Sequence, residues 1–221
     1  MKMMSWKLAL AARLLSVGGL AWAGVIPYTV NGDALVFDDD YGAAGLTWTA
    51  DANLFKTQYD ADNTVVAQII TAVPTVADSY YGSHSVVAGD FNTTNGRMTW
   101  WGATAWAEWL GIIGYGGAND WGLWSALNSD GTGTCGPAYN CIDSALGHLF
   151  YTEGGLIAPA SITSSATLSA DFTNLQNYVY WSGTEYAPNP NNAWNFNTDN
   201  GNQNNDNKDN QNYGWAARPR E

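Results

Sequence analysis

The chain has 221 residues, and its 20 acidic and 8 basic residues give it a net charge of −12. This excess of negative charge opposes binding to nucleic acid, anionic lipid or sulfated polysaccharide, so neutral, cationic or metal-bridged partners are expected. A chain of this size buries roughly 70% of its unfolded surface on folding, and a single domain is therefore the default expectation.

The first 23 residues have the composition of a secretory signal peptide. Lys2 and Lys7 precede an apolar run over residues 8–20, and Ala21-Trp22-Ala23 provides the small-x-small pattern of a cleavage site. The apolar run is too short for a good transmembrane helix, and no second segment of membrane length follows it. We expect an exported protein, whether extracellular, at the cell surface or in the periplasm, with no membrane span and one mature domain over residues 24–221.

The first predicted elements are two short strands at residues 34–37 and 46–49. The acidic turn at residues 38–40 separates them, and they read as a hairpin or as paired edge strands. From residue 58 to residue 96 the pattern is weaker, with a β-branched run at 64–76 and a polar loop at 89–96. We interpret residues 58–96 as an insertion that packs on the main fold.

An amphipathic helix is predicted over residues 98–113. Ala105, Trp109 and Ile113 recur there at four-residue spacing, and glycines from Gly114 onward end the pattern. We expect the helix to begin near Thr99 and its tryptophans to lie in the core.

A second, shorter helix is predicted over residues 143–152. Ala145, Leu149 and Phe150 would share its buried face, and Gly154-Gly155 would end it. A Ser/Thr-rich linker is expected at residues 161–169. Two helices of this kind pack against a sheet.

The two cysteines, Cys135 and Cys141, lie between these helices. In an exported protein two such neighbours are expected to form a disulfide, which would contribute roughly 2 kcal/mol and pin a surface loop. A redox-active pair usually has C-x-x-C spacing at a helix N-terminus, whereas this pair flanks a Gly-Pro turn. The sequence therefore favours a structural disulfide.

Three later segments, at residues 178–182, 193–198 and 213–218, alternate side chains between two faces as strands do. In the middle segment Trp194 and Phe196 point one way, while Asn195 and Asn197 point the other way. Burial of the aromatic face would thus display the amides. Residues 199–212 are then expected to form the loop between the last two strands, with a turn at Asn200-Gly201.

Half of the residues from 189 to 212 are Asn. The Asn side chain offers a donor and an acceptor without charge, so a cluster of them on a rigid scaffold would form a polar recognition surface. Two alternatives stay open: a disordered low-complexity tail, against which the interleaved aromatic residues count, and an invariant loop that satisfies its own hydrogen bonds. The candidate ligand-binding residues are Asn195, Asn197, Asp199, Asn200, Asn202, Gln203, Asn204, Asn205, Asp206, Asn207, Lys208, Asp209, Asn210 and Asn212.

No catalytic constellation is evident in the sequence. The chain has two histidines, His84 and His148, and no nucleophile motif beside them, so a structural role is expected for His148. Glu153, Glu185, Asp199 and Asp206 are nominal carboxylates for glycoside hydrolysis, but such pairs arise freely among 20 acids. We expect a protein that is not an enzyme.

Three acidic clusters offer hard oxygen ligands for calcium, at residues 38–40, 128–131 and 205–209. None of them completes a calcium-loop pattern, and solvated acidic turns are the favoured interpretation. We expect that no cofactor is required and leave calcium binding open.

Several motifs occur in an order that resembles the bacterial Lcl-type C-terminal domain family. They are NDWGLWSALN at Trp121, GHLFY at His148, YWSGTEY, AWNFNTDNGNQNN and the final WAARP, and the likeness covers roughly residues 34–218. The chain departs from the family at residues 121–124, where W-R-L-P is usual. The resemblance implies an α+β fold distantly similar to C-type lectins and formylglycine-generating enzymes, with two helices on a small twisted antiparallel sheet. Cys135 and Cys141 do not match the catalytic cysteines of those enzymes, so oxidase activity is not implied.

The resemblance also gives the Asn residues a role. Lectin-fold variable proteins of diversity-generating retroelements carry many Asn codons near the C-terminus, and here these residues would be variable ligand contacts. The implied function is adhesion or recognition, with a glycan or protein ligand on another surface as the partner. The alternatives are a carbohydrate-active hydrolase and a structural envelope protein without a soluble ligand.

Overall fold

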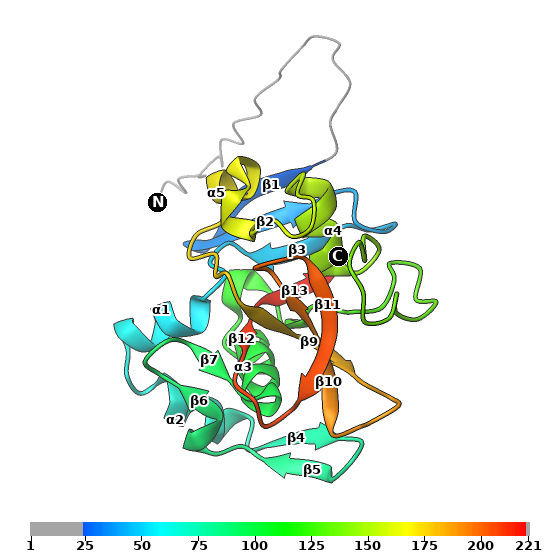
Figure 1. The fold of residues 1–221 in the computed structure, drawn as a ribbon. Helices are drawn as coiled ribbons and strands as arrows, with labels where there is room; N and C mark the ends of the chain where they lie inside the picture. The colour runs from blue at the N-terminus through cyan, green and yellow to red at the C-terminus, as the bar shows by residue number, and fades with distance from the viewer. Residues whose placement is uncertain (1–23, 220–221) are drawn as a thin grey trace, which may run out of the picture.

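A computed structural model describes residues 24–219, so the expected signal peptide at residues 1–23 lies outside the described residues. Two sheets, two small hairpins and five α-helices make up the described part of the chain (Figure 1). The predicted α+β class is confirmed. No helix between residues 24 and 219 is both long and apolar enough to cross a membrane.

The first sheet has five strands in the order β1-β2-β3-β13-β8. The predicted pairing of the two early segments is confirmed, with Val36 opposite Trp48. Strand β1 was not predicted; it pairs with β2 through a turn at Asn31 and Gly32, and both residues have positive φ, as a two-residue hairpin turn requires. The strands are β1 (Val25–Val30), β2 (Asp33–Asp38), β3 (Leu46–Thr49), β8 (Gly122–Leu123) and β13 (Ala216–Pro219).

The second sheet has the order β11-β10-β9-β12, where β12 runs parallel to β9 and the other neighbours are antiparallel. The prediction that residues 199–212 form only a loop was wrong, because six of them form β11 opposite β10. The expected last strand at residues 213–218 is divided between the two sheets, as β12 and β13. The strands are β9 (Val179–Glu185), β10 (Asn192–Asn197), β11 (Asn202–Asn207) and β12 (Tyr213–Gly214).

Two hairpins lie in the segment that was interpreted as an insertion or directly after it. They pair β4 (Thr75–Asp78) with β5 (Gly82–Ser85), and β6 (Phe91–Asn92) with β7 (Arg97–Met98).

Both predicted helices are present. The first is α3 (Trp100–Ile112), and its N-cap Thr99 accepts a hydrogen bond from the backbone N–H of Gly102. The second is α4 (Ala145–His148), which continues as a single π-helical turn, η3 (Leu149–Glu153). The residues expected on its buried face, Ala145, Leu149 and Phe150, are buried.

Three further helices were not predicted: α1 (Leu54–Ala61), α2 (Val65–Ala72) and α5 (Ala166–Asp171). The β-branched run gives helix α2 because Val65, Ile69 and Val73 recur every four residues and bury one helical face. The Ser/Thr-rich stretch contains the N-cap of α5, Ser165, whose side chain accepts from Leu168. Short 3₁₀ turns occur at η1 (Ala88–Asp90), η2 (Tyr115–Gly117) and η4 (Ile162–Ser164).

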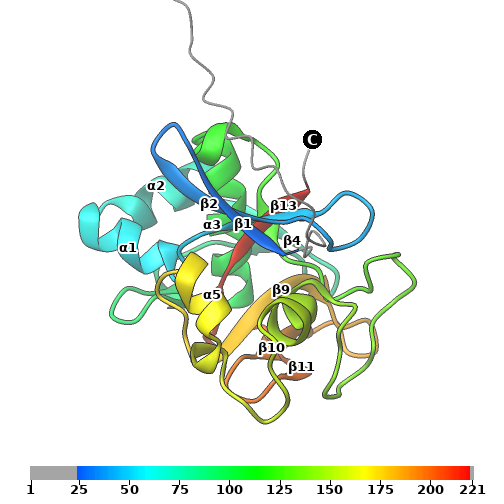
Figure 2. The same cartoon turned by 90° about the horizontal axis from the view of Figure 1, so that it is seen from above.

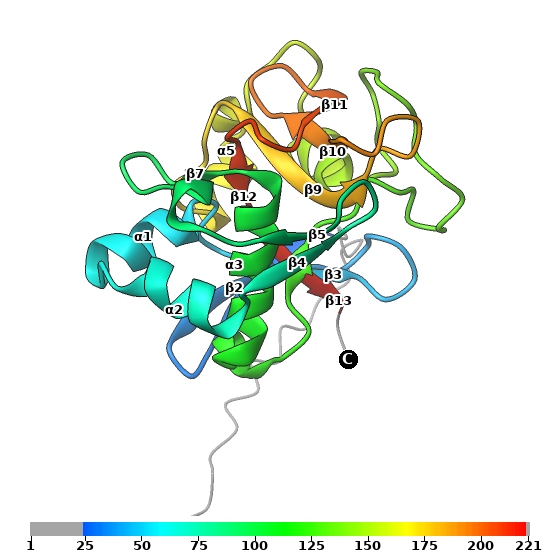
Figure 3. The ribbon, with the colours of Figure 1, turned by 90° about the horizontal axis from the view of Figure 1, so that it is seen from below.

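The sheets separate two apolar cores. Neighbouring strand residues point into opposite cores, for example Leu35 and Val36 or Tyr180 and Trp181, as a period of two requires. Helices α1, α2 and α3 lie together over the first core (Figure 3), while α4 and α5 lie on the other side of the strands (Figure 2). The segment at residues 58–96 contains α2, whose apolar side chains pack in the same core as those of α3. The segment therefore forms part of the first core.

Candidate ligand-binding site

The paired strands β10 and β11 place a row of amides on one face of the second sheet. Asn195 lies opposite Asn204, and Asn197 lies opposite Asn202. Residues at opposite and alternate positions share a face, so these four side chains lie together. They contribute to a surface hollow of about 410 Å³, which we call the amide hollow; its lining residues are Tyr139, Val179, Asn195, Asn197, Asn200, Asn202, Asn204, Asn205 and Asp206.

The opposite face of the same strands is buried. Phe196 and its cross-strand partner Gln203 are fully buried, and the Phe196 ring lies 5.5 Å from the ring of Phe150 on η3. The next residue on η3, Tyr151, donates a hydrogen bond of 2.6 Å from its hydroxyl to the carbonyl oxygen of Gly201, in the turn between β10 and β11. The amide hollow therefore rests on a packed aromatic support.

The disulfide loop covers the outer edge of β11. The predicted bond between Cys135 and Cys141 is present. Within this loop, the backbone N–H of Ala138 donates to the carbonyl of Gln203 at 3.0 Å, and the N–H of Gln203 donates back at 2.9 Å. The loop thereby extends the sheet by one bridge and places the half-exposed Tyr139 at the rim of the amide hollow. Sequence reasoning missed Tyr139, although its position inside the short disulfide loop was a usable signal.

A buried ammonium group fixes the end of β11. The Nζ atom of Lys208 donates to Asp78 Oδ2 at 2.8 Å and to Glu185 Oε1 at 3.1 Å, and it lies 4.6 Å from the ring centroid of Trp100. The side chains of Lys208 and Asp78 are both fully buried. This ion pair joins the Asn-rich hairpin to β4, which precedes it by more than a hundred residues.

Asp78 accepts further hydrogen bonds, from Trp101 Nε1 and from the backbone N–H groups of Tyr80 and Tyr81. Burial opposes the charged form, but the hydrogen bonds from Lys208, Tyr81, Trp101 and Tyr80 outweigh it and lower the pKa of Asp78 to about 2. Asp78 is therefore ionised at neutral pH.

The structure divides the candidate residues into two groups. Asn195, Asn197, Asn200, Asn202, Asn204, Asn205 and Asp206 line the amide hollow. The remaining candidates, Asp199, Gln203, Asn207, Lys208, Asp209, Asn210 and Asn212, do not line it. Three of these, Gln203, Lys208 and Asn212, are buried, which corrects their placement on a displayed surface. Asn195 lines the hollow but is only 4% exposed, so its expected display on the surface is corrected as well.

A second polar cluster lies where the end of β2 meets α4 and η3. The strands separate it from α3. Its members are Asp38, Asp40, His148 and Glu153, and one polar atom from each lies within 4.8 Å of all the others. Burial alone would lower the pKa of His148, but the neighbouring carboxylates of Asp38, Glu153 and Asp40 raise it to about 10. Burial raises the pKa of Asp38, against the opposing effect of His148.

Two of the four carboxylates considered for glycoside hydrolysis have separate partners. Glu153 belongs to the His148 cluster, and Glu185 contacts Lys208 and Ser79. Asp130, in another of the acidic clusters, accepts from the backbone and hydroxyl of Thr132 within its own turn.

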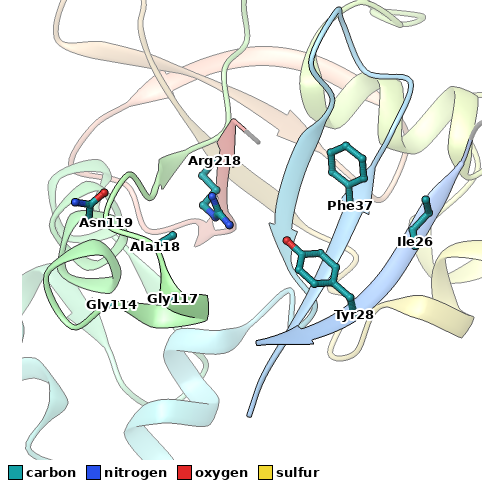
Figure 4. A pocket seen from close by; sticks show the side chains of 8 residues that line it. All are labelled: Ile26, Tyr28, Phe37, Gly114, Gly117, Ala118, Asn119 and Arg218. Carbon is teal, nitrogen blue, oxygen red and sulfur yellow. The ribbon is translucent and has the colours of Figure 1, made fainter. Parts of the chain in front are cut away.

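A larger hollow than the amide hollow, of about 810 Å³, lies between β1, β2, the end of β13 and the segment after α3 (Figure 4). Among its lining residues Arg218 alone is charged, and its guanidinium lies 3.7 Å from Asp120 and 5.5 Å from the ring centroid of Trp121. Three polar side chains, those of Tyr28, Asn119 and Arg218, line it, whereas six Asn side chains and Asp206 line the amide hollow. The lining residues are Ile26, Tyr28, Phe37, Gly114, Gly117, Ala118, Asn119 and Arg218.

Comparison with known proteins returned no relative: no family model, curated protein or solved structure matches this chain.

Proposed function

We propose that this chain is an exported recognition domain of C-type-lectin-like architecture, which binds a neutral polar ligand, a glycan or a peptide, in the amide hollow. The observation that carries the proposal is the register of β10 and β11, which brings Asn195, Asn197, Asn202 and Asn204 onto one face. Each amide offers donors and an acceptor without charge, as recognition of hydroxyl or peptide groups requires.

The surroundings of the amide hollow support the same proposal. The ring of Tyr139 at the rim provides an apolar surface on which a sugar or a peptide side chain can stack. The aromatic support, the disulfide loop and the Lys208 ion pair hold the strands in place. A preorganised polar surface loses less conformational entropy on binding than a flexible tail would.

Arrays of neutral glycans and of random peptides, probed with the mature chain, test the proposal. Wild-type protein should bind members of at least one array, and the double variant Asn202→Ala, Asn204→Ala should bind them at least about tenfold more weakly, the effect of losing roughly 1.4 kcal/mol. Asn63→Ala, at an exposed position between α1 and α2, is the matched control. Equal binding by the double variant and the control, or no binding to either array, would contradict the proposal.

We further propose that the exposed amides vary through a retroelement. Deep sequencing of the 3′ end of the gene, in a population grown from one cell, should then show adenine substitutions in the codons of Asn197, Asn202 and Asn204. Codons for the buried Gln203 and Lys208 should stay constant. A uniform sequence at all five codons would contradict active diversification and leave the binding proposal to the arrays.

A further inference from the structure

We propose that Asp38, Asp40, His148 and Glu153 form a binding site for a divalent transition-metal ion. The four residues come from two stretches of the chain that the fold brings together: Asp38 ends β2 and Asp40 lies in the following loop, while His148 ends α4 and Glu153 ends the π-helical turn η3. Single π-helical turns occur frequently at functional sites.

The distances from His148 to the three carboxylates are close to those between the ligands of one metal ion. The His148 Nε2 atom lies 2.9 Å from Asp40 Oδ1, 3.5 Å from Asp38 Oδ1 and 3.5 Å from Glu153 Oε1. In a tetrahedral site with bonds of about 2.1 Å, ligand atoms are separated by about 3.4 Å. Only small side-chain movements are needed for the four groups to share an ion.

Asp38 provides an independent observation. Its side chain is fully buried, and neither of its oxygens accepts a hydrogen bond. The His148 ring lies beside it, with Nε2 at 3.5 Å from Asp38 Oδ1. A buried carboxylate without hydrogen bonds is costly, and coordination to a metal ion would satisfy it.

The donor set selects the class of ion. Calcium takes six to eight oxygen ligands, whereas this cluster offers one imidazole nitrogen among three carboxylates. Imidazole together with carboxylate suits zinc and similar first-row ions. Three carboxylates facing one histidine also leave a surplus of negative charge that attracts a cation, and the partly exposed Asp40 provides a route from solvent.

Titration of the metal-free, tag-free chain with zinc chloride in a calorimeter tests the site. We expect one zinc ion per chain, and Asp40→Asn and His148→Gln should each weaken zinc binding at least about tenfold, because loss of even an outer partner of a metal ligand costs that much. Asp130→Asn and His84→Gln are the matched controls, one an exposed turn aspartate and the other a histidine that faces Asp90. Both controls should bind zinc as the wild type does.

Circular dichroism shows whether each variant is folded. If His148→Gln does not fold, Asp40→Asn provides the test, because its side chain is partly exposed. In crystals soaked with zinc, an anomalous peak should lie about 2 Å from His148 Nε2. Zinc binding that is equal in the wild type and in Asp40→Asn would overturn the proposal. Tighter binding of calcium chloride than of zinc chloride would overturn the assignment to a transition metal.

Discussion

Replacing Lys208 with Met should destabilise the fold strongly. The substitution keeps an unbranched side chain of similar length but removes the ammonium group that donates to Asp78 and Glu185. Asp78 would stay buried without its cation, and breaking a buried ion pair from one side costs about 3–5 kcal/mol. In a domain of this size each kcal/mol shifts Tm by about 2–4 °C, so Tm should fall by roughly 6–20 °C.

Urea unfolding of the mature chain, with the disulfide intact, measures this loss. Lys56→Met is the matched control, since Lys56 pairs with Asp60 on the surface of α1 and such pairs contribute less than about 1 kcal/mol. Combining Lys208→Met with Asp78→Asn should cost less than the sum of the two single changes, because the second change removes the unpaired charge. A Lys208→Met variant that is as stable as the control would refute the assignment of Lys208 as an anchor of β11.

Three more predictions concern stability and are checked by the same urea titration. The pKa of Asp78 is lowered to about 2, so the stability that its charged form contributes is present above about pH 4 and is lost as the pH falls towards 2. Between these two pH values Asp78→Asn should lose less stability than the wild type. Parallel curves of stability against pH for the two proteins would count against the assigned pKa. Gly201→Ala should cost about 1–3 kcal/mol more than Gly131→Ala, since both residues have positive φ but only at Gly201 would the new Cβ meet Tyr151, 2.4 Å from its hydroxyl oxygen; equal losses would exclude that clash. Thr99→Ala should cost about 1–3 kcal/mol, because it removes both the α3 cap and the hydrogen bond from the Thr99 hydroxyl to Asp90, and an unchanged midpoint would show that both are dispensable.

Local periodicity predicted the elements that have an apolar face. Helix α3 and strand β10 followed from the spacing of their large apolar residues, and the alternation in β10 also identified which amides share a face. Strand β11 has no such signal, because its six residues are all Asn, Gln or Asp. It is held by pairing with β10 and with Ala138, and these contacts form only in the folded chain.

The Lys208 ion pair and the cluster around His148 could not be predicted from local sequence. Lys208 meets Asp78 across 130 residues of chain, and His148 meets Asp40 across 108. Each of these residues is unremarkable among its neighbours, and only the topology brings the pairs together. Helix α2 shows a different limit: the β-branched run at residues 64–76 was assigned to no element, although the four-residue spacing of Val65, Ile69 and Val73 indicated a helix.

The position of the disulfide loop has a consequence for self-assembly. An exposed edge strand is a template for pairing with another chain, and strands rich in Asn and Gln form ladders of stacked amides in cross-β fibrils. The loop closed by Cys135 and Cys141 occupies the edge of β11 through Ala138 and so blocks strand addition there. A chain kept in a reducing compartment would lose this covalent closure, and its polar edge strand would then be available to other copies of the protein.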